Sequence, residues 1–352
     1  MLGYRLQKRD EPWNWGTPFI IVGALVLSFG ISALLLELQG KSAVQGLFVL
    51  WQGSFGASWA LEDALLKSIP IFLCALGVAT AFRMQVWNIG AEGQFALGAI
   101  GATWAALTFP GLPGYLLMPL MFICAAIFGA FWAYIPAVLR LKLQVNEIIS
   151  TLMLNYIAIL LLEYLVFGAW KDPASFGFPV TPEFSPAAII GQIGDTRLHW
   201  GFAVCVGSGI AMWAFMRFTR LGFDIKVAGE GERIAMYSRL PYGMLTILVM
   251  AISGALAGWA GCIEASATIN RLQPSIMVGY GYTAIVVAWL ARLHPLYIGI
   301  AAYLLAALRV GVENMQLEMQ TPASFGSIME GLILMSVLAG QMFVTYKIVK
   351  KK

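Results

Sequence analysis

The chain alternates between long apolar stretches and short polar segments over nearly its whole length. Windows of about 20 apolar residues, the length that an α-helix needs to cross a bilayer, predict ten spans. They cover residues 17–38, 64–82, 95–109, 115–139, 148–168, 199–216, 242–263, 283–291, 296–311 and 325–346. The third, eighth and ninth are short for a full crossing. We therefore expect an all-α polytopic membrane protein with about ten transmembrane helices, or eight, some of them broken, tilted or re-entrant.

A polar, glycine-bearing string interrupts this pattern at residues 88–94. In hydrocarbon every backbone N–H and C=O must be satisfied, so a polar break at membrane depth is either buried in protein or lines a wet cavity. An ionisable residue in such a break, here Glu92, is a candidate functional residue. We predict that Asn88, Glu92 and Gln94 line a solute path. The alternative is that Glu92 lies at the inner interface as the N-terminal charge of the next helix.

A second polar group lies on the predicted helix 148–168. Glu147, Thr151 and Asn155 recur every four residues, which places them on one face. A polar stripe on an apolar helix has to face protein or water. These residues therefore either line the path or hydrogen-bond a neighbouring helix.

Another glycine-bearing polar break occurs in the second half of the chain and contains Asn270, Tyr280 and Tyr282. It mirrors the break at residues 88–94 in pattern, although not in residues, as in transporter folds built from repeats. We count these three residues as further candidates for the path. The rings of the two tyrosines are suited to stacking a base, but aromatic side chains at a membrane surface are more common.

The largest inner polar segment, residues 217–240, carries charges of both signs. Gly229 and Gly231 precede a short predicted helix over 232–239, in which Ile234, Ala235 and Ser238 share one face. A short helix with such a face, presented between two spans, is typical of a docking surface for a soluble protein. A long outer segment, residues 169–197, is rich in proline and glycine and is either a structured cap or a plain connecting loop.

The amino-acid composition indicates a membrane protein. Apolar residues make up 60% of the chain and charged residues 11%, and the mean hydropathy is +0.79. A net charge of +4, scattered over loops, gives no indication of nucleic-acid binding. Of the 22 Lys and Arg, 16 fall in the predicted inner segments and 6, Arg309 among them, in the outer ones. This asymmetry predicts that both termini are cytoplasmic.

The chain offers little for catalysis or metal binding. Its four cysteines fall inside apolar stretches, without a CxxC pair, and read as small buried hydrophobes. His199 and His294 stand alone at the edges of apolar runs, so we expect interfacial side chains and no metal. No group of nucleophile, base and orienting residue is visible, and Gly40-Lys41-Ser42 lacks the earlier glycine of a phosphate-binding loop. We therefore expect neither an enzyme nor an ATP-binding chain.

Four runs of sequence identify a family. They are RMQVWNIGAEGQFALGAIGA from Arg83, NEIISTLMLNYIA from Asn146, VAGEGERIAMYS from Val227 and GYTAIVVAWLARLHPL from Gly281. Together they resemble the permease subunit of bacterial ATP-binding-cassette importers. They are most similar to the nucleoside and simple-sugar permeases related to the ribose and branched-chain amino-acid permeases. The resemblance covers about residues 70–340, with the runs in the right order.

This resemblance implies the partners. Two cytoplasmic ATPase subunits, or a fused one, hydrolyse ATP; a second permease subunit, identical or homologous, completes the path; an outer solute-binding protein delivers the solute. The loop after Val227 corresponds to the coupling helix that fits a groove on the ATPase, although an Asn-Pro pair commonly follows the Gly-Glu where this chain has Gly231 and Glu232. The coupling residues implied are Ala228, Gly229, Glu230, Gly231, Glu232, Arg233, Ala235, Met236 and Tyr237.

We therefore predict the membrane subunit of an ATP-driven importer in the bacterial inner membrane, with a nucleoside or related sugar-containing solute and no cofactor in this chain. The alternative is a secondary transporter or channel in which the carboxylates of Glu92 and Glu330 couple the solute to protons. The organisation expected has three parts. Residues 1–63 form an inner segment, a first span and an outer loop; residues 64–346 form the permease core with the coupling loop 217–240; residues 347–352 form a basic inner tail.

Overall fold

The computed structural model describes residues 4–9 and 16–350. The chain forms two compact units, which we describe separately. One unit combines both ends of the chain, Met1–Ala64 and Ala306–Lys352, and the other is the continuous stretch Leu65–Leu305.

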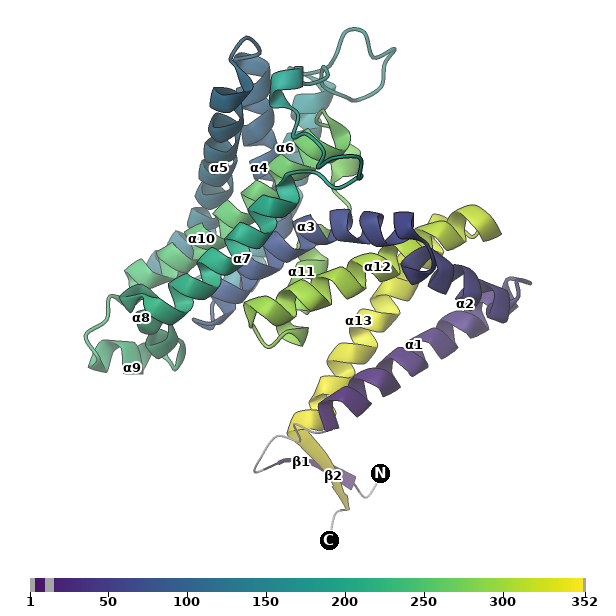
Figure 1. Ribbon diagram of the computed structural model, residues 1–352. Helices are drawn as coiled ribbons and strands as arrows, with labels where there is room; N and C mark the ends of the chain where they lie inside the picture. Colours follow the sequence, from purple (N-terminus) through teal and green to yellow (C-terminus); the bar gives the residue numbers. More distant parts are fainter. Residues whose placement is uncertain (1–3, 10–15, 351–352) are drawn as a thin grey trace. The chain divides into compact units, whose positions relative to one another are not determined.

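Each predicted span coincides with a helix in the described part of the chain (Figure 1). These helices are α1 Thr17–Leu38, α3 Ser58–Phe82, α4 Ala91–Thr108, α5 Gly114–Leu143, α6 Glu147–Phe167, α7 Gly201–Phe218, α10 Tyr242–Ile263, α11 Tyr280–Leu290, α12 Pro295–Met319 and α13 Ala323–Thr345. Among the described residues, six helical segments are long and apolar enough to cross a membrane: α3, α5, α6, α7, α12 and α10 with its extension to Ile269. The structure thus has the expected helical membrane architecture, while the count of ten crossings stays a prediction.

The ninth predicted span differs from expectation. It was expected to be short, but α12 has 25 residues because the helix continues through Arg309, Glu313 and Glu318. Arg309, which the charge count assigns to the outer side, lies inside this helix, and its side of the membrane stays a prediction. The eighth, α11, has 11 residues and is short, as expected.

The unit formed by the two ends of the chain is built on α1 and α13, which pack against each other (Figure 1). Ser28 of α1 donates a hydrogen bond to the carbonyl of Leu332 at 3.2 Å. The short helix α2, Ala43–Trp51, continues into a π-helical turn, Gln52–Gly56. Strands β1, Tyr4–Lys8, and β2, Tyr346–Lys350, form an antiparallel ribbon that the all-α prediction did not include.

Lys41 closes the end of α12 within this unit. Its Nζ donates to the carbonyls of Met319 and Gln320, each at 2.7 Å. The last carbonyls of a helix have no partner within the helix and carry its negative partial charge, so a lysine stabilises them.

Small residues hold the core of the second unit together. A Cβ on Gly98 of α4 would overlap the backbone of Gly258 in α10, and one on Gly254 would overlap the carbonyl of Gly129 in α5. These glycines allow α4, α5 and α10 to approach backbone to backbone, as small residues do in membrane helix packing. Helix α4 is consequently buried along almost its entire length.

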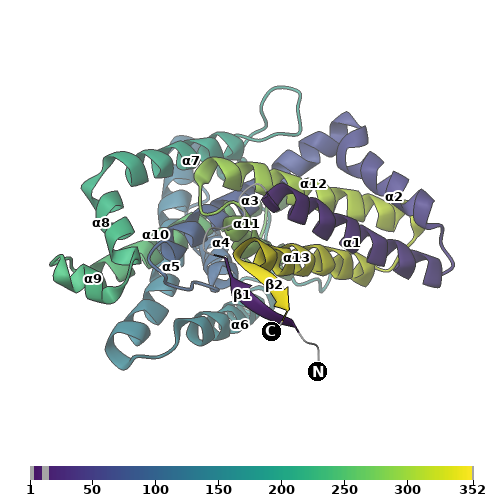
Figure 2. The same cartoon turned by 90° about the horizontal axis from the view of Figure 1, so that it is seen from below.

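The two ends of this unit differ in structure. At one end α8, Arg220–Gly229, and α9, Glu232–Tyr237, follow α7 (Figures 1 and 2). At the other, residues 169–197 pack on the chain after α10. There the N–H groups of Thr181, Phe184 and Ile190 donate to the carbonyls of Leu272, Asn270 and Ser266. This outer segment is therefore structured by hydrogen bonds to the core.

Candidate functional site

The polar break before α4 is shaped by its own side chains. The Asn88 Oδ1 accepts a hydrogen bond from the N–H of Gly90 at 3.0 Å, the local turn that asparagine favours. The amides of Asn88 and Gln94 also bond each other in both directions, at 3.0 Å each. Asn88 Nδ2 further donates to Ser253 Oγ of α10 at 2.9 Å. All three side chains are buried, so the break is a hydrogen-bonded unit inside the protein.

Helix α6 supplies a second set of contacts to the same break. Asn155 Oδ1 accepts from the N–H of Gly93 at 2.8 Å, while its Nδ2 donates to the carbonyl of Ile89 at 2.9 Å. Thr151 Oγ1 accepts from the N–H of Ile89 at 3.3 Å. Both side chains are fully buried. The polar stripe of α6 thus satisfies the backbone groups that the break leaves outside a helix.

Glu147 lies apart from this cluster, at the first turn of α6. Its Oε1 accepts a charge-assisted hydrogen bond from Arg140 Nη1 at 2.8 Å. It also accepts from the N–H of Trp87 at 3.4 Å. Glu147 therefore ties the ends of α5 and α6 to the start of the break.

Glu92 joins the two polar breaks that the sequence predicts. Its carboxylate accepts from the N–H of Gly279 at 2.9 Å and from the N–H of Gly281 at 2.6 Å. These groups belong to the N-terminus of α11, where free N–H groups and the helix dipole favour a carboxylate. Gly281 has to be a glycine for this approach, because a Cβ there would overlap the backbone of Glu92.

The remaining candidates lie in different surroundings. Tyr282 is 37% exposed, and its hydroxyl accepts from Asn155 Nδ2 at 3.3 Å, so it joins the cluster at an exposed edge. Tyr280 is buried near Glu264, with its hydroxyl 3.5 Å from Glu264 Oε1. Asn270 adopts the left-handed conformation at the turn after α10, and the hydrogen bonds of the described residues do not join it to the cluster.

Two residues of the site were missing from the predicted set. Ser253 lies in a run of small residues in α10 and does not stand out in the sequence. It belongs to the site because it accepts a hydrogen bond from Asn88, 165 positions away. Glu264, 8% exposed, follows α10 directly. The rule that singled out Glu92, a carboxylate in an apolar stretch, would have found Glu264 as well.

The docking segment at α8 and α9 divides into a packed side and an exposed side. Ala228, Gly229 and Ala235 are buried, and a Cβ on Gly229 would overlap the carbonyl of Arg83, at the start of the break. Of the other predicted coupling residues, Gly231, with φ at +139°, begins α9 and is half-buried. The exposed ones are Glu230, Glu232, Arg233, Met236 and Tyr237.

The predicted face of the docking helix is wrong in one respect. Ala235 is fully buried, whereas Ile234 is 46% exposed and Ser238 lies beyond the end of α9, so these three do not form one surface. The exposed apolar side chains are instead Ile234, Met236 and Tyr237, the last 94% exposed. Packing of Ala235 against the protein decides which side of this short helix remains outside.

Among the described residues, three or more His, Cys, Asp or Glu side chains do not come together in a group that could hold a metal ion. His199, outside α7, is buried and accepts from the N–H of Gly201 at Nδ1. Burial lowers the pKa of His199 to about 4, so the ring is neutral at physiological pH. The side chain is buried in the protein, and its expected place at the membrane interface stays a prediction.

Long apolar helices around a buried polar break are the architecture of an integral membrane protein with a polar interior. Residues 60–338 match the family described as branched-chain amino acid transport system / permease component, and the chain belongs to this family. It is thus a multi-pass permease subunit of the cytoplasmic membrane and not an enzyme. This family match confirms the resemblance seen in the sequence. As a permease component, the chain works with a separate ATPase subunit and a solute-binding protein.

Characterised relatives extend over nearly the whole chain. The glucose ABC transporter permease protein TsgB13 of Haloferax volcanii is 31% identical and covers 95% of this chain and 90% of its own. The guanosine ABC transporter permease protein NupP of Bacillus subtilis is 31% identical over 93% of this chain and 95% of its own. Among solved structures, an inward-facing conformation of a putative metal-chelate type ABC transporter is 15% identical, with a TM-score of 0.45 over 94% of this chain and 98% of that one.

Proposed function

We propose that the chain forms, with a second permease subunit, the path of an ATP-driven importer for a nucleoside or related sugar-containing solute. The solute class rests on the glucose and guanosine permeases among its relatives. The proposed complex has two ATPase subunits, or one fused ATPase, beneath the two permeases, an outer binding protein and both termini of the chain on the cytoplasmic side.

One observation carries this proposal: the docking segment packs directly on the chain that leads into the polar break. Gly229 contacts the carbonyl of Arg83, five positions before Asn88. The guanidinium of Arg83 donates in turn to the carbonyl of Leu293, after α11, at 2.7 Å. Because packed backbone does not deform continuously, a displacement of α8 and α9 by an ATPase is passed to both chain segments that Glu92 joins.

An aromatic cluster lies on this route. The rings of Trp87 and Trp289 stack with centroids 5.4 Å apart, and Phe82 contacts both, at 5.2 and 5.8 Å. Trp87 precedes Asn88, and Trp289 lies near the end of α11. In the proposed mechanism this cluster closes the inner end of the path and opens when the docking segment moves.

The candidate path residues have two roles in this proposal. Asn88, Gln94, Thr151 and Asn155 hold the break in shape through hydrogen bonds with protein groups. Tyr282 presents a ring at its exposed edge for the solute. Glu147, Asn270 and Tyr280 fix the ends of the helices that carry these groups, and Glu92 locks α4 to α11.

The alternative of a proton-coupled transporter has weaker support. The carboxylate of Glu92 already accepts from two backbone N–H groups at the start of α11, which gives it a structural role. The side chain of Glu330 lies outside the described residues. The family assignment favours the ATP-driven importer.

The test uses the assembled importer in liposomes. Tyr237→Asp places a charge on the exposed side of α9 without disturbing the packed side, and we expect it to abolish solute-stimulated ATP hydrolysis and uptake together. Phe178→Asp is the matched control, because Phe178 is an aromatic residue of the outer segment with 70% exposure. Normal coupling in Tyr237→Asp and in Met236→Asp would overturn the docking assignment.

A further inference from the structure

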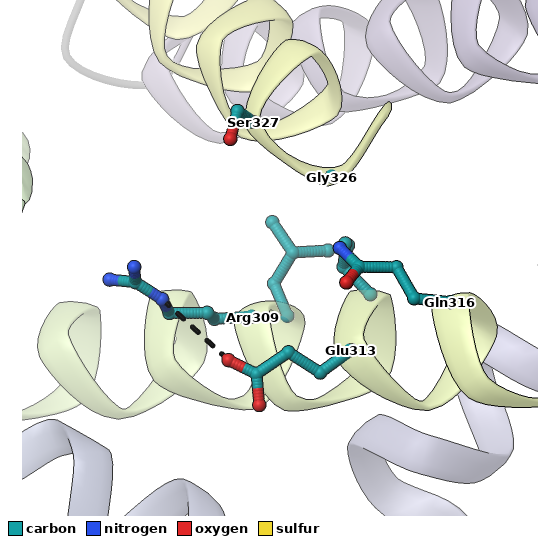
Figure 3. A pocket seen from close by; sticks show the side chains of 7 residues that line it. Arg309, Glu313, Gln316, Gly326 and Ser327 are labelled. Carbon is teal, nitrogen blue, oxygen red and sulfur yellow. Dashed lines mark ion pairs between the residues drawn. The ribbon is translucent and has the colours of Figure 1, made fainter. Parts of the chain in front are cut away.

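Hollows of different character open along α12. A small one, of about 130 Å³, lies beside Arg309 and Glu313 (Figure 3), and these two side chains form an ion pair there. A larger one, of about 420 Å³, is a groove between α7 and the start of α12, within the unit Leu65–Leu305. The proposed path does not use this groove.

The floor of the groove is the ring of Phe72 in α3, with a glycine on each neighbouring helix. A Cβ on Gly209 of α7 would lie 2.9 Å from Phe72 Cζ, and one on Gly299 of α12 would lie 3.5 Å from Phe72 Cε2. Phe72 itself is buried. Because α7 and α12 carry no side chain opposite this ring, a hollow remains between them.

The walls of the groove are apolar and open to the surroundings. Ile210 of α7 and Leu296 of α12 line the groove, although they are 62% and 66% exposed. Helix α7 is long and apolar enough to cross a membrane, and its outward side chains therefore meet either hydrocarbon or another membrane protein. The groove is nearly three times as large as the cavity of about 150 Å³ that holds a benzene ring, so it has room for a segment of an acyl chain.

One end of the groove carries a cation. Trp213 lines the groove, and the guanidinium carbon of Arg217 lies 5.8 Å from the centroid of its ring. Arg217 is exposed in the last turn of α7, and the ion pairs found in the described part of the chain do not include it. A cation–π contact does not neutralise the charge, so the guanidinium keeps donors that suit a phosphate.

His294 adds a second polar group, immediately before α12. Its exposed ring lines the groove and packs against Tyr297, with centroids 4.9 Å apart. A neutral imidazole retains one N–H donor, which suits a phosphate or ester oxygen. Arg217 begins the predicted inner segment 217–240, and α12 begins on the same side in the predicted topology. The polar end of the groove is therefore expected at the cytoplasmic face.

We propose that this groove binds an anionic phospholipid of the cytoplasmic leaflet, with one acyl chain over Phe72 and the phosphate at Arg217. Headgroups of that leaflet carry negative charge, and basic groups between membrane helices on this side attract them. The proposal adds a lipid ligand to the importer and does not depend on the solute. The competing explanation is a second permease subunit over the groove, which would have to supply a carboxylate to Arg217.

Photo-crosslinking in liposomes tests the groove directly. The assembled importer is reconstituted in phosphatidylcholine with a minor fraction of photoreactive lipid, either phosphatidylglycerol or phosphatidylcholine with a diazirine in one acyl chain. Labelled residues are identified by mass spectrometry. We expect labelling of α7 and the start of α12 to be about fivefold stronger with phosphatidylglycerol, the preference that one arginine near an anionic headgroup provides.

Two variants separate the apolar and the charged parts of the groove. Gly299→Leu starts from an ordinary contact with Phe72 and fills the hollow, so labelling by both lipids should be lost. Arg217→Gln should remove the preference for phosphatidylglycerol and leave labelling by phosphatidylcholine unchanged. Gly207→Leu and Arg220→Gln are the matched controls, because both residues are exposed outside the groove, on α7 and α8, and neither change should alter labelling.

The outcomes that would overturn the proposal are distinct. Equal labelling by the two lipids, unchanged in Arg217→Gln, would show that the groove holds only bulk lipid. Absence of labelling at α7 and α12 would exclude an acyl chain from the groove. A disulfide between Leu296→Cys side chains of two permease subunits would identify a subunit interface there, since the four native cysteines are buried. ATP hydrolysis by each variant reports that the importer has assembled.

Discussion

The polar break before α4 and the polar stripe of α12 place the same kinds of side chain in apolar surroundings but use them differently. At the break, Asn88, Gln94 and Asn155 are fully or almost fully buried, with partners at about 3 Å. Along α12, Arg309 and Glu313 are 4.0 Å apart beside a cavity. At the break the hydrogen bonds reach backbone groups of another helix and fix the shape of the chain, whereas Arg309 and Glu313 are side chains one turn apart on a single helix. The role of a polar side chain in a membrane helix therefore depends on which groups it contacts.

The strongest test of this contrast compares a glycine that packs against the break, Gly281, with a glycine of α13, Gly331. Gly281→Ala introduces a Cβ that overlaps the backbone of Glu92, so α11 must move and we expect a loss of about 3 kcal/mol or more in stability. Gly331→Ala in α13 meets nothing within 4 Å and should be neutral or stabilising by up to about 1 kcal/mol. Thermal unfolding in detergent measures both. Equal melting temperatures of the two variants would show that the break is not closely packed around Gly281.

Loss of one acceptor in the closed region should have the next largest effect. In Glu92→Gln one of the two oxygen acceptors becomes an NH₂ group, which faces an N–H of Gly279 or Gly281. A buried donor without an acceptor costs about 1–3 kcal/mol, and uptake should fall with stability. Glu183→Gln is the control, because Glu183 is 72% exposed and its ion pair with Arg271 should contribute less than about 1 kcal/mol. Unchanged uptake and stability in Glu92→Gln would contradict the role of the carboxylate.

Acid should weaken the outer end of the same unit. His199 has an ordinary pKa of about 6.5 and a folded pKa of about 4, so between these values the unfolded chain binds a proton that the folded one does not. Its contribution to stability is complete above pH 6.5 and declines as the pH falls toward 4. Melting temperatures of the unmodified chain and of His199→Asn across this range measure the effect. Parallel pH profiles would disprove it.

The smallest effect is expected at the exposed edge of the break. Tyr282→Phe removes one hydroxyl that accepts from Asn155 at 3.3 Å and should cost less than about 1 kcal/mol of stability. Contact with the solute would instead appear as a several-fold change in the KM of uptake. Tyr164→Phe, in an exposed position of α6, is the control. If both variants have the KM of the unmodified importer, the hydroxyl of Tyr282 does not contact the solute.

The sequence predicts the helices well and their contacts poorly, for physical reasons. Apolar length depends only on neighbouring residues, so α1 and α10 have the predicted bounds. Gly279, whose N–H donates to Glu92, lies 187 positions away along the chain. A pattern among neighbouring residues cannot predict a contact over that separation. The apolar window 296–311 ends eight residues before α12 does, because Glu313 and Glu318 lower the local hydropathy without ending the helix. Ala235 and Ile234 are adjacent apolar residues of one short helix, so the sequence does not distinguish them. Only packing against the rest of the protein decides which side chain is buried.

The ribbon of β1 and β2 has a consequence for topology. Since Tyr4 pairs with Lys350 and Lys8 with Tyr346, the first and last described residues are held within one hydrogen-bonded ladder. Because a bilayer cannot divide a ladder of this kind, we expect both strands to lie in one compartment, in line with the predicted even number of crossings. Fragments of a split fluorescent protein fused to opposite termini of a single molecule should then reassemble.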